Sequence, residues 1–182
     1  MPLRRRMRSL IAHAEDGGAA AILLTCSLYG PVTQEVTPAR PLPILASDQA
    51  LFARVAQEAF RRVAVLGPLD SAVQDTVRRL QEFLGQPDGG QSGLHRDVHV
   101  EGVVVAGAGR AAADRDLGLL ERLAADQARR IAPSVDLIVL GQFSLTPALR
   151  AAQAAVSVPV LSPPHLAAGV LREQLATARM SA

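Results

Sequence analysis

The sequence predicts an α/β fold built on parallel strands. Short apolar runs of strand length alternate with amphipathic stretches of helix length, and the apolar runs end in glycine, proline or polar residues. Strands that alternate with helices in this way form βαβ units, in which the strands are parallel. The chain has 182 residues, of which 49% are hydrophobic, so it is long enough to bury a core.

The first half of the chain begins with a helix that Asp16-Gly17-Gly18 ends, and a buried strand follows it. Gly67-Pro68 ends a later strand in the same way. Glycine and polar residues over 86–93 predict a surface loop. The expected elements are helix 3–15, strand 20–25, strand 43–45, helix 47–60, strand 62–66 and helix 70–84.

The second half repeats this alternation, and Pro164 stands near the first turn of the last helix, where proline is tolerated. The expected elements are strand 99–106, helix 111–131, strand 136–140, helix 146–155, strand 158–161 and helix 164–178. The apolar strands that end in Thr25-Cys26-Ser27 and in Gly141-Gln142 look like internal counterparts. Each can carry one wall of a shared cleft.

Composition excludes several classes of function. The chain has no lysine, so it can form neither the Schiff base of a pyridoxal phosphate enzyme nor a P-loop. A net charge of +2 and 3% aromatic residues give little support for a nucleic-acid partner. No apolar run has the length of a membrane span or follows the basic start as in a secretory signal. A single cysteine forms no internal disulfide or metal cluster, which favours a cytoplasmic location.

Cys26 is the candidate catalytic residue. It is the only cysteine, and it comes directly after an apolar run and before the turn at Tyr29-Gly30-Pro31. The carboxyl ends of parallel strands are where α/β proteins place their ligands. A thiol at this point can act as a nucleophile or a base. The alternative is that Cys26 packs as a small buried hydrophobe, as free cysteines often do.

Several segments together resemble one known family: Gly18 through Ser27, 43–45 with 49–51, 62–67, 136–141 and 158–163. The chain is similar to the aspartate/glutamate/hydantoin racemase superfamily over nearly its whole length. The resemblance implies two flavodoxin-like parallel-sheet lobes related by pseudo-twofold symmetry, over residues 1–60 and 61–182. The last helix can pack back on the first lobe.

The resemblance also implies the chemistry, which is proton transfer at a substrate's α-carbon without a cofactor or a metal. In this family a cysteine from each lobe stands on one face of that carbon, and Cys26 matches the first cysteine. Gln142 stands where the second is expected, and an amide does not exchange protons at neutral pH. Gln142 can instead orient a carboxylate, bind water or simply end its strand.

The hydroxyls near these positions have two interpretations. Thr25 and Ser27 are expected to hold a substrate carboxylate or to cap the turn. Ser144 and Ser162 lie on the same predicted sheet edge as Gln142, as ligand contacts or as local caps. His165 can serve as an acid or base in place of the missing thiol, or lie at the surface.

The family usually has a strand, a helix and a second strand before the segment that starts this chain, so the N-terminal lobe is expected to be incomplete. Exposed strand edges pair readily, which predicts a homodimer. The expected ligand is a small carboxylate or an amino acid, with no nucleic-acid or membrane partner.

Three functions remain open. The first is a PLP-independent isomerase of the racemase family, for which a single cysteine makes decarboxylation or isomerisation as conceivable as racemisation. The second is a catalytically impaired relative that binds a small carboxylate or is structural. The third is a cysteine hydrolase, for which the sequence offers no convincing histidine partner.

Overall fold

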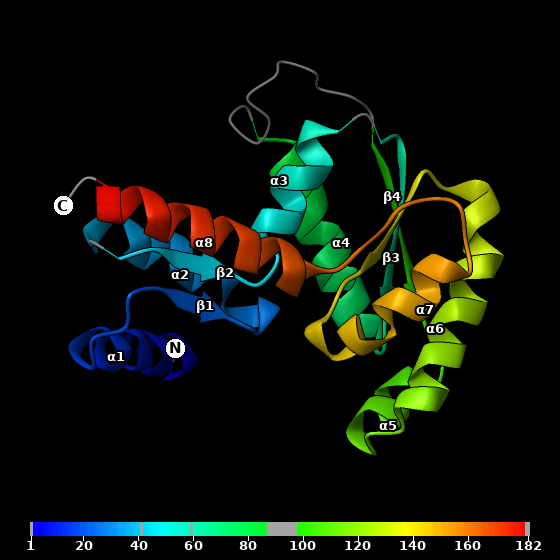
Figure 1. Ribbon diagram of the computed structural model, residues 1–182, viewed down its shortest axis with the longest axis horizontal. Coiled ribbons are helices and arrows are strands. Elements are labelled where there is room, and N and C mark those ends of the chain that lie inside the picture. The colour runs from blue at the N-terminus through cyan, green and yellow to red at the C-terminus, as the bar shows by residue number, and fades with distance from the viewer. Residues whose placement is uncertain (1, 41, 59, 87–97, 181–182) are drawn as a thin grey trace. The chain divides into compact units, whose positions relative to one another are not determined.

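The computed structural model describes residues 2–40, 42–58, 60–86 and 98–180 (Figure 1). The chain forms two compact units, the first made of residues 1–50 and 164–182 and the second of residues 51–163. Every strand pair within each unit is parallel. The α/β class predicted from the sequence is therefore confirmed, while the expected domain boundary at residue 60 stays a prediction.

The first unit is built on a sheet of two parallel strands in which Leu24 lies opposite Ala46. The side chains of a strand point alternately to its two faces, so each face has its own apolar cluster. Leu24 and Ile44 pack with α1 and α2 on one face, and Leu23 and Leu45 pack with α8 on the other. The elements are α1 (Pro2–Asp16), β1 (Ile22–Leu24), α2 (Gly30–Val36), β2 (Ile44–Ala46) and α8 (Pro163–Met180).

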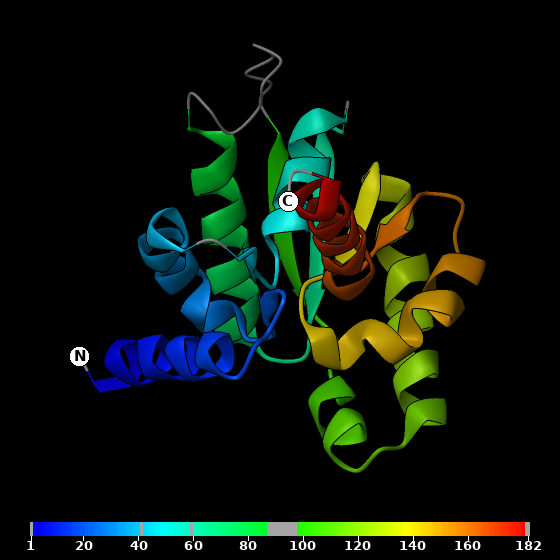
Figure 2. The same ribbon diagram turned by 60° about the vertical axis from the view of Figure 1, so that its left-hand side comes forward.

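The second unit has a four-stranded sheet in the order β4-β3-β5-β6, with β5 buried along its whole length. Figure 2 shows α4 on one face of this sheet and α6 with α7 on the other. The elements are α3 (Gln49–Gln57, in this unit from Leu51 on), β3 (Arg62–Gly67), α4 (Asp70–Leu84), β4 (His99–Val104), α5 (Ala108–Ala113), α6 (Leu117–Ile131), β5 (Leu137–Leu140), α7 (Leu149–Ala154) and β6 (Val160–Leu161).

The core of the second unit depends on alanines that let α6 and α7 approach the sheet closely. Ala124, Ala128 and Ala152 are fully buried in one cluster with Leu66 and Leu140 of the strands. Over the described ranges, no helix combines the length and the hydropathy that a membrane span requires.

Three segments differ from the sequence-based expectation. The helix expected over 111–131 is broken, because Arg115 has a φ of 58° and the Asp116 side chain accepts a hydrogen bond from the backbone of Leu119, which starts α6. Pro147 lies within a 3-10 stretch, so α7 begins only at Leu149. Helix α2 was not expected at all. The predicted loop over 86–93 lies outside the described residues from 87 on.

Asp136 fixes the start of β5 beside the start of β3. Its Oδ2 accepts hydrogen bonds of 3.0 Å from the backbone N–H groups of both Arg61 and Arg62, and the Arg62 guanidinium donates to Oδ1 at 3.2 Å. The hydrogen bond from the Arg61 backbone is the main reason that the pKa of Asp136 lies below its ordinary value. A carboxyl with a lowered pKa stabilises the fold above its unfolded-state pKa, and this contribution is lost as the pH falls through the lowered value.

We expect Asp136→Asn to lower the Tm by a few degrees at neutral pH, because the amide carries no charge for the three donors. The difference from wild type should shrink as the pH falls below 4 or so, where the native carboxyl also becomes neutral. Thermal unfolding monitored by circular dichroism between pH 7 and pH 3 measures both effects.

The matched control is Asp114→Asn, since in the described part of the chain the Asp114 side chain pairs with the exposed Arg110 side chain one helical turn away. Exposed pairs of this kind contribute little to stability. An equal loss of Tm in the two variants at pH 7 would contradict the role of Asp136.

Candidate active site

Cys26 lies at the carboxyl end of β1 in the first unit, and its side chain is exposed. Its backbone is extended, with φ of −114° and ψ of 120°, and the 3-10 turn Ser27–Tyr29 follows at once. The Cys26 carbonyl accepts the backbone N–H of Tyr29 at 3.1 Å, while the thiol forms no capping hydrogen bond. The thiol is therefore held by the turn and open to a ligand.

A hollow of about 260 Å³ lies beside this thiol, within the first unit. One wall is formed by Met7, Leu10 and Ile11 of α1, and the other by the segment from Ile22 to Cys26 together with Tyr29. Thr25 and Cys26 thus line the same hollow as the residues of β1. Ser27 is half-buried in the turn that follows.

Two polar residues at the end of the neighbouring strand were missed as site candidates. Ser47 and Asp48 come one and two positions after the Leu24–Ala46 pair, and their exposed fractions are 4% and 3%. Among the described residues, the Ser47 hydroxyl is buried without a hydrogen-bond partner. A signal was present in the sequence, since both residues directly follow an apolar strand at the edge where ligands bind.

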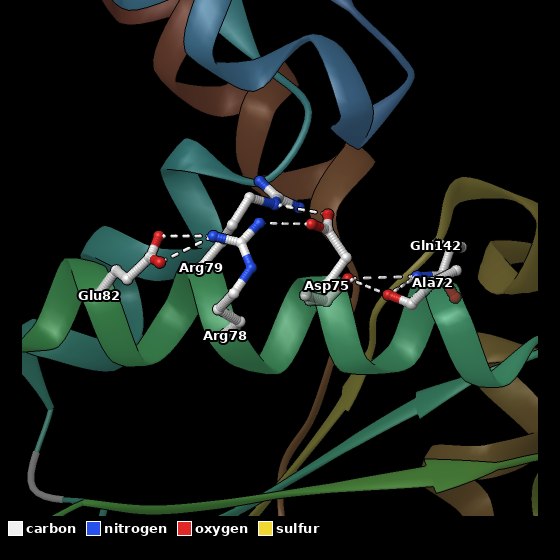
Figure 3. Close-up of polar contacts among 7 residues, drawn as sticks. Ala72, Asp75, Arg78, Arg79, Glu82 and Gln142 are labelled. Atoms are coloured by element: carbon white, nitrogen blue, oxygen red, sulfur yellow. Dashed lines mark hydrogen bonds and ion pairs between the residues drawn. The ribbon is translucent and has the colours of Figure 1, made fainter.

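Gln142 lies in the second unit, where its side chain turns toward α4 (Figure 3). Its Nε2 group donates at 3.3 Å both to the carbonyl of Ala72 and to the hydroxyl of Thr76. A carbonyl can only accept, so this contact fixes the orientation of the amide. In the described part of the chain, the buried Oε1 atom has no hydrogen-bond partner, and a Cβ at Gly67 would come within 2.5 Å of it.

Further along α4, charged side chains form a chain of ion pairs, also drawn in Figure 3. Arg78 bonds Asp75 at 2.6 Å and Glu82 at 2.7 Å, and Arg79 bonds Asp75 at 2.9 Å. Burial alone would raise the pKa of Asp75, but the hydrogen bonds from Arg78 and Arg79 outweigh it and hold the pKa below its ordinary value. The side chains lie three or four residues apart on one helix, which is typical of helix stabilisation.

The two serines expected near Gln142 have different surroundings. Ser144 is exposed in the 3-10 stretch Phe143–Ala148. Ser162 is 2% exposed, and its hydroxyl shares a hydrogen bond of 2.8 Å with the Thr146 hydroxyl. His165 is exposed near the start of α8.

The expected site residues fall into two sets. Thr25, Cys26 and Ser27 are consecutive in the first unit, whereas Gln142, Ser144 and Ser162 belong to the second. Within the second set, the Gln142 and Ser162 side chains bond different partners. Within the described ranges, no three His, Cys, Asp or Glu side chains gather as a metal site would require.

The sequence matches the family model described as Asp/Glu/Hydantoin racemase over residues 4–171. The chain belongs to this family. The resemblance inferred from the strand ends is thereby confirmed. No curated protein matches the sequence significantly.

Solved structures of the racemase fold are similar to this chain. A glutamate racemase from Francisella tularensis in complex with D-glutamate has a TM-score of 0.66 and 13% identity, covering 97% of this chain and 66% of that one. A glutamate racemase from Bacillus anthracis has a TM-score of 0.62 and 10% identity, covering 94% and 65%. Unliganded arylmalonate decarboxylase has a TM-score of 0.64 and 22% identity, covering 94% and 76%.

These likenesses show the fold of the racemase family. The chain spans about two thirds of the length of the two glutamate racemases.

The surroundings of Gln142 predict an order of stability among its variants. Gln142→Met keeps the size of the side chain and loses two hydrogen bonds. Gln142→Glu also turns a carboxylate oxygen toward the Ala72 carbonyl, so at pH 7 we expect it to be the less stable variant by about 1–3 kcal/mol. Urea unfolding measures both free energies.

The difference in free energy of unfolding between Gln142→Met and Gln142→Glu should become smaller at acid pH, because the protonated carboxyl of the glutamate can donate a hydrogen bond to the Ala72 carbonyl. Equal stability of wild type, Gln142→Met and Gln142→Glu at pH 7 would show that the contact with α4 contributes nothing.

Proposed function

We propose that this member of the racemase family moves a proton at the α-carbon of a small carboxylate or amino acid, with Cys26 as the acid and base and without a cofactor. The single observation that carries the proposal is the exposed thiol of Cys26, which borders a hollow at the carboxyl end of a parallel strand. The family membership of the chain supports the same reaction type.

The reaction needs a base because a carbon-bound proton next to a carboxylate is weakly acidic. In the proposed step, the Cys26 thiolate takes the α-proton and forms an S–H bond. The electron pair of the broken C–H bond spreads into the carboxylate, where the hydroxyls of Thr25 and Ser27 are suited to donate hydrogen bonds. The S–H group exchanges its proton with solvent, and transfer of a proton from sulfur back to carbon completes the cycle.

A single thiol works on a single face of the carbon. Gln142 matches the position of the family's second cysteine, and its amide does not titrate at neutral pH. The proton therefore returns to the face it left, and the expected result is exchange with solvent at retained configuration. This outcome differs from racemisation, in which a second group protonates the opposite face.

The single thiol also favours a second candidate reaction, decarboxylation of a substituted malonate. There the bond to one carboxylate breaks, carbon dioxide leaves, and the electron pair stays on the α-carbon. The Cys26 S–H then protonates that carbon from one side, and water restores the thiol. One acid suffices for this reaction.

We expect the protein in deuterium oxide to introduce deuterium at the α-carbon of aspartate or glutamate faster than optical rotation is lost, or to release carbon dioxide from a substituted malonate. Proton NMR and polarimetry follow the first reaction. Cys26→Ser should slow either reaction by about 10²–10⁴-fold, the usual contribution of a general acid or base. Because Cys26 is exposed, its replacement should leave the Tm unchanged.

Three other outcomes are informative. Loss of optical rotation as fast as exchange would overturn the one-face mechanism. Carboxylate binding without exchange or carbon dioxide release would favour a catalytically impaired relative. If Cys26→Ser had the same activity as wild type, the Cys26 thiol would be excluded as the acid and base.

The location and assembly state expected from the sequence stay predictions. We expect a cytoplasmic protein that forms a homodimer, and sedimentation equilibrium measures its mass in solution. Its partners are expected to be small molecules.

A further inference from the structure

Ser47 holds a buried hydroxyl whose hydrogen-bonding capacity is unused. The residue is 4% exposed, and the hydroxyl has no hydrogen-bond partner among the described residues. A buried donor that makes no hydrogen bond lowers the stability of a fold. Native structures contain few such groups, and a role in ligand binding or a bound water is the usual explanation.

The position of Ser47 connects it with the candidate active site. Leu24 and Ala46 are paired at the ends of β1 and β2, and Thr25 and Ser47 are the residues that follow them. Neighbouring strands lie roughly 4.8 Å apart, so the chain leaves β2 at Ser47 beside the point where it leaves β1 at Thr25. Thr25 is exposed and directly precedes Cys26. Ser47 is therefore a neighbour, on the β2 side, of the residues assigned to the substrate.

The chemistry of the side chain fits an anionic ligand. A serine hydroxyl donates one hydrogen bond, and rotation about its Cα–Cβ bond carries it between staggered positions. Asp48 is also buried in the connection between β2 and α3, at 3% exposed. An ionised carboxylate can only accept hydrogen bonds, so Ser47 is the residue of this connection that can bind a carboxylate.

We propose that Ser47 is a substrate-binding residue of the Cys26 site, whose hydroxyl turns to donate a hydrogen bond to the carboxylate that binds there. This inference rests on the proposed function for the position of the carboxylate and adds a residue that holds it. The unpaired hydroxyl destabilises the free protein, and the bound ligand removes that penalty. Replacement of Ser47 therefore has opposite effects on stability and on binding.

The first test measures stability by thermal unfolding. Ser47→Ala removes the hydroxyl and adds no atom, so we expect the Tm of the free protein to rise by about 2–4 °C. The matched control is Thr33→Val, because the Thr33 hydroxyl is also buried, at 2% exposed, but donates to the Gly30 carbonyl at 2.6 Å. Its Tm should fall. A Tm of Ser47→Ala that does not rise would indicate a partner such as a bound water and would overturn the proposal.

The second test measures binding at the site through its thiol. Cys26 is the only cysteine, so its alkylation by iodoacetamide, followed by mass spectrometry, reports whether a ligand covers it. We expect malonate to protect Cys26 in wild type. Ser47→Ala should need about tenfold more malonate for equal protection, as the loss of a hydrogen bond to a charged group gives. Thr33→Val should need the same concentration as wild type.

The outcomes separate this residue's role from the proposed reaction. Weaker protection in Ser47→Ala, without deuterium exchange or carbon dioxide release in wild type, would support the Ser47 contact and refute the catalytic function. Exchange that depends on Cys26, with equal protection in wild type and Ser47→Ala, would support the function and refute the contact. Failure of malonate to protect wild type, or an equal loss of protection in Ser47→Ala and Thr33→Val, would also overturn the proposal.

Discussion

Helix α4 packs against its sheet at positions that have no side chain. A Cβ at Gly67 or Gly102 would meet Val73 of α4 at less than ordinary contact distance, and one at Gly141 would lie 3.6 Å from Thr76 of the same helix. Because the helix lies this close, the first turn of α4 comes within reach of the end of β5. The Gln142 amide then bonds the Ala72 carbonyl, and the side chain serves to hold the helix on the sheet.

This packing gives the Gln142 side chain a structural role in the second unit that requires no proton exchange. Gln142 has a structural contact that a cysteine side chain is too short to make in the same way. The chemistry we propose for the chain rests on the first unit, where the Cys26 thiol makes no capping hydrogen bond and Cys26 borders a hollow whose described lining residues are uncharged. One-face proton transfer is the reaction that we propose for these surroundings.

Particular residues show which features of the structure could be predicted from the sequence and which could not. The parallel α/β class and the end of β1 shortly before Cys26 were predictable, because apolar runs of strand length and the polar residues after them depend only on local sequence. The break before α6 was not, since it depends on a positive φ at Arg115 and on the Asp116 cap. Ser47 was missed although it follows an apolar strand, because the sequence does not show that its hydroxyl is buried without a hydrogen-bond partner among the described residues.

The sequence by itself determined the class of fold, the family and the single thiol, because alternating elements and the identities at strand ends are properties of the chain. The tertiary structure alone decided what surrounds each candidate. It turned Gln142 toward α4, buried Ser162 against Thr146 and lined the space at Cys26 with α1. These outcomes depend on which helix packs against which strand, and residues far apart in the sequence carry no local signal of that contact.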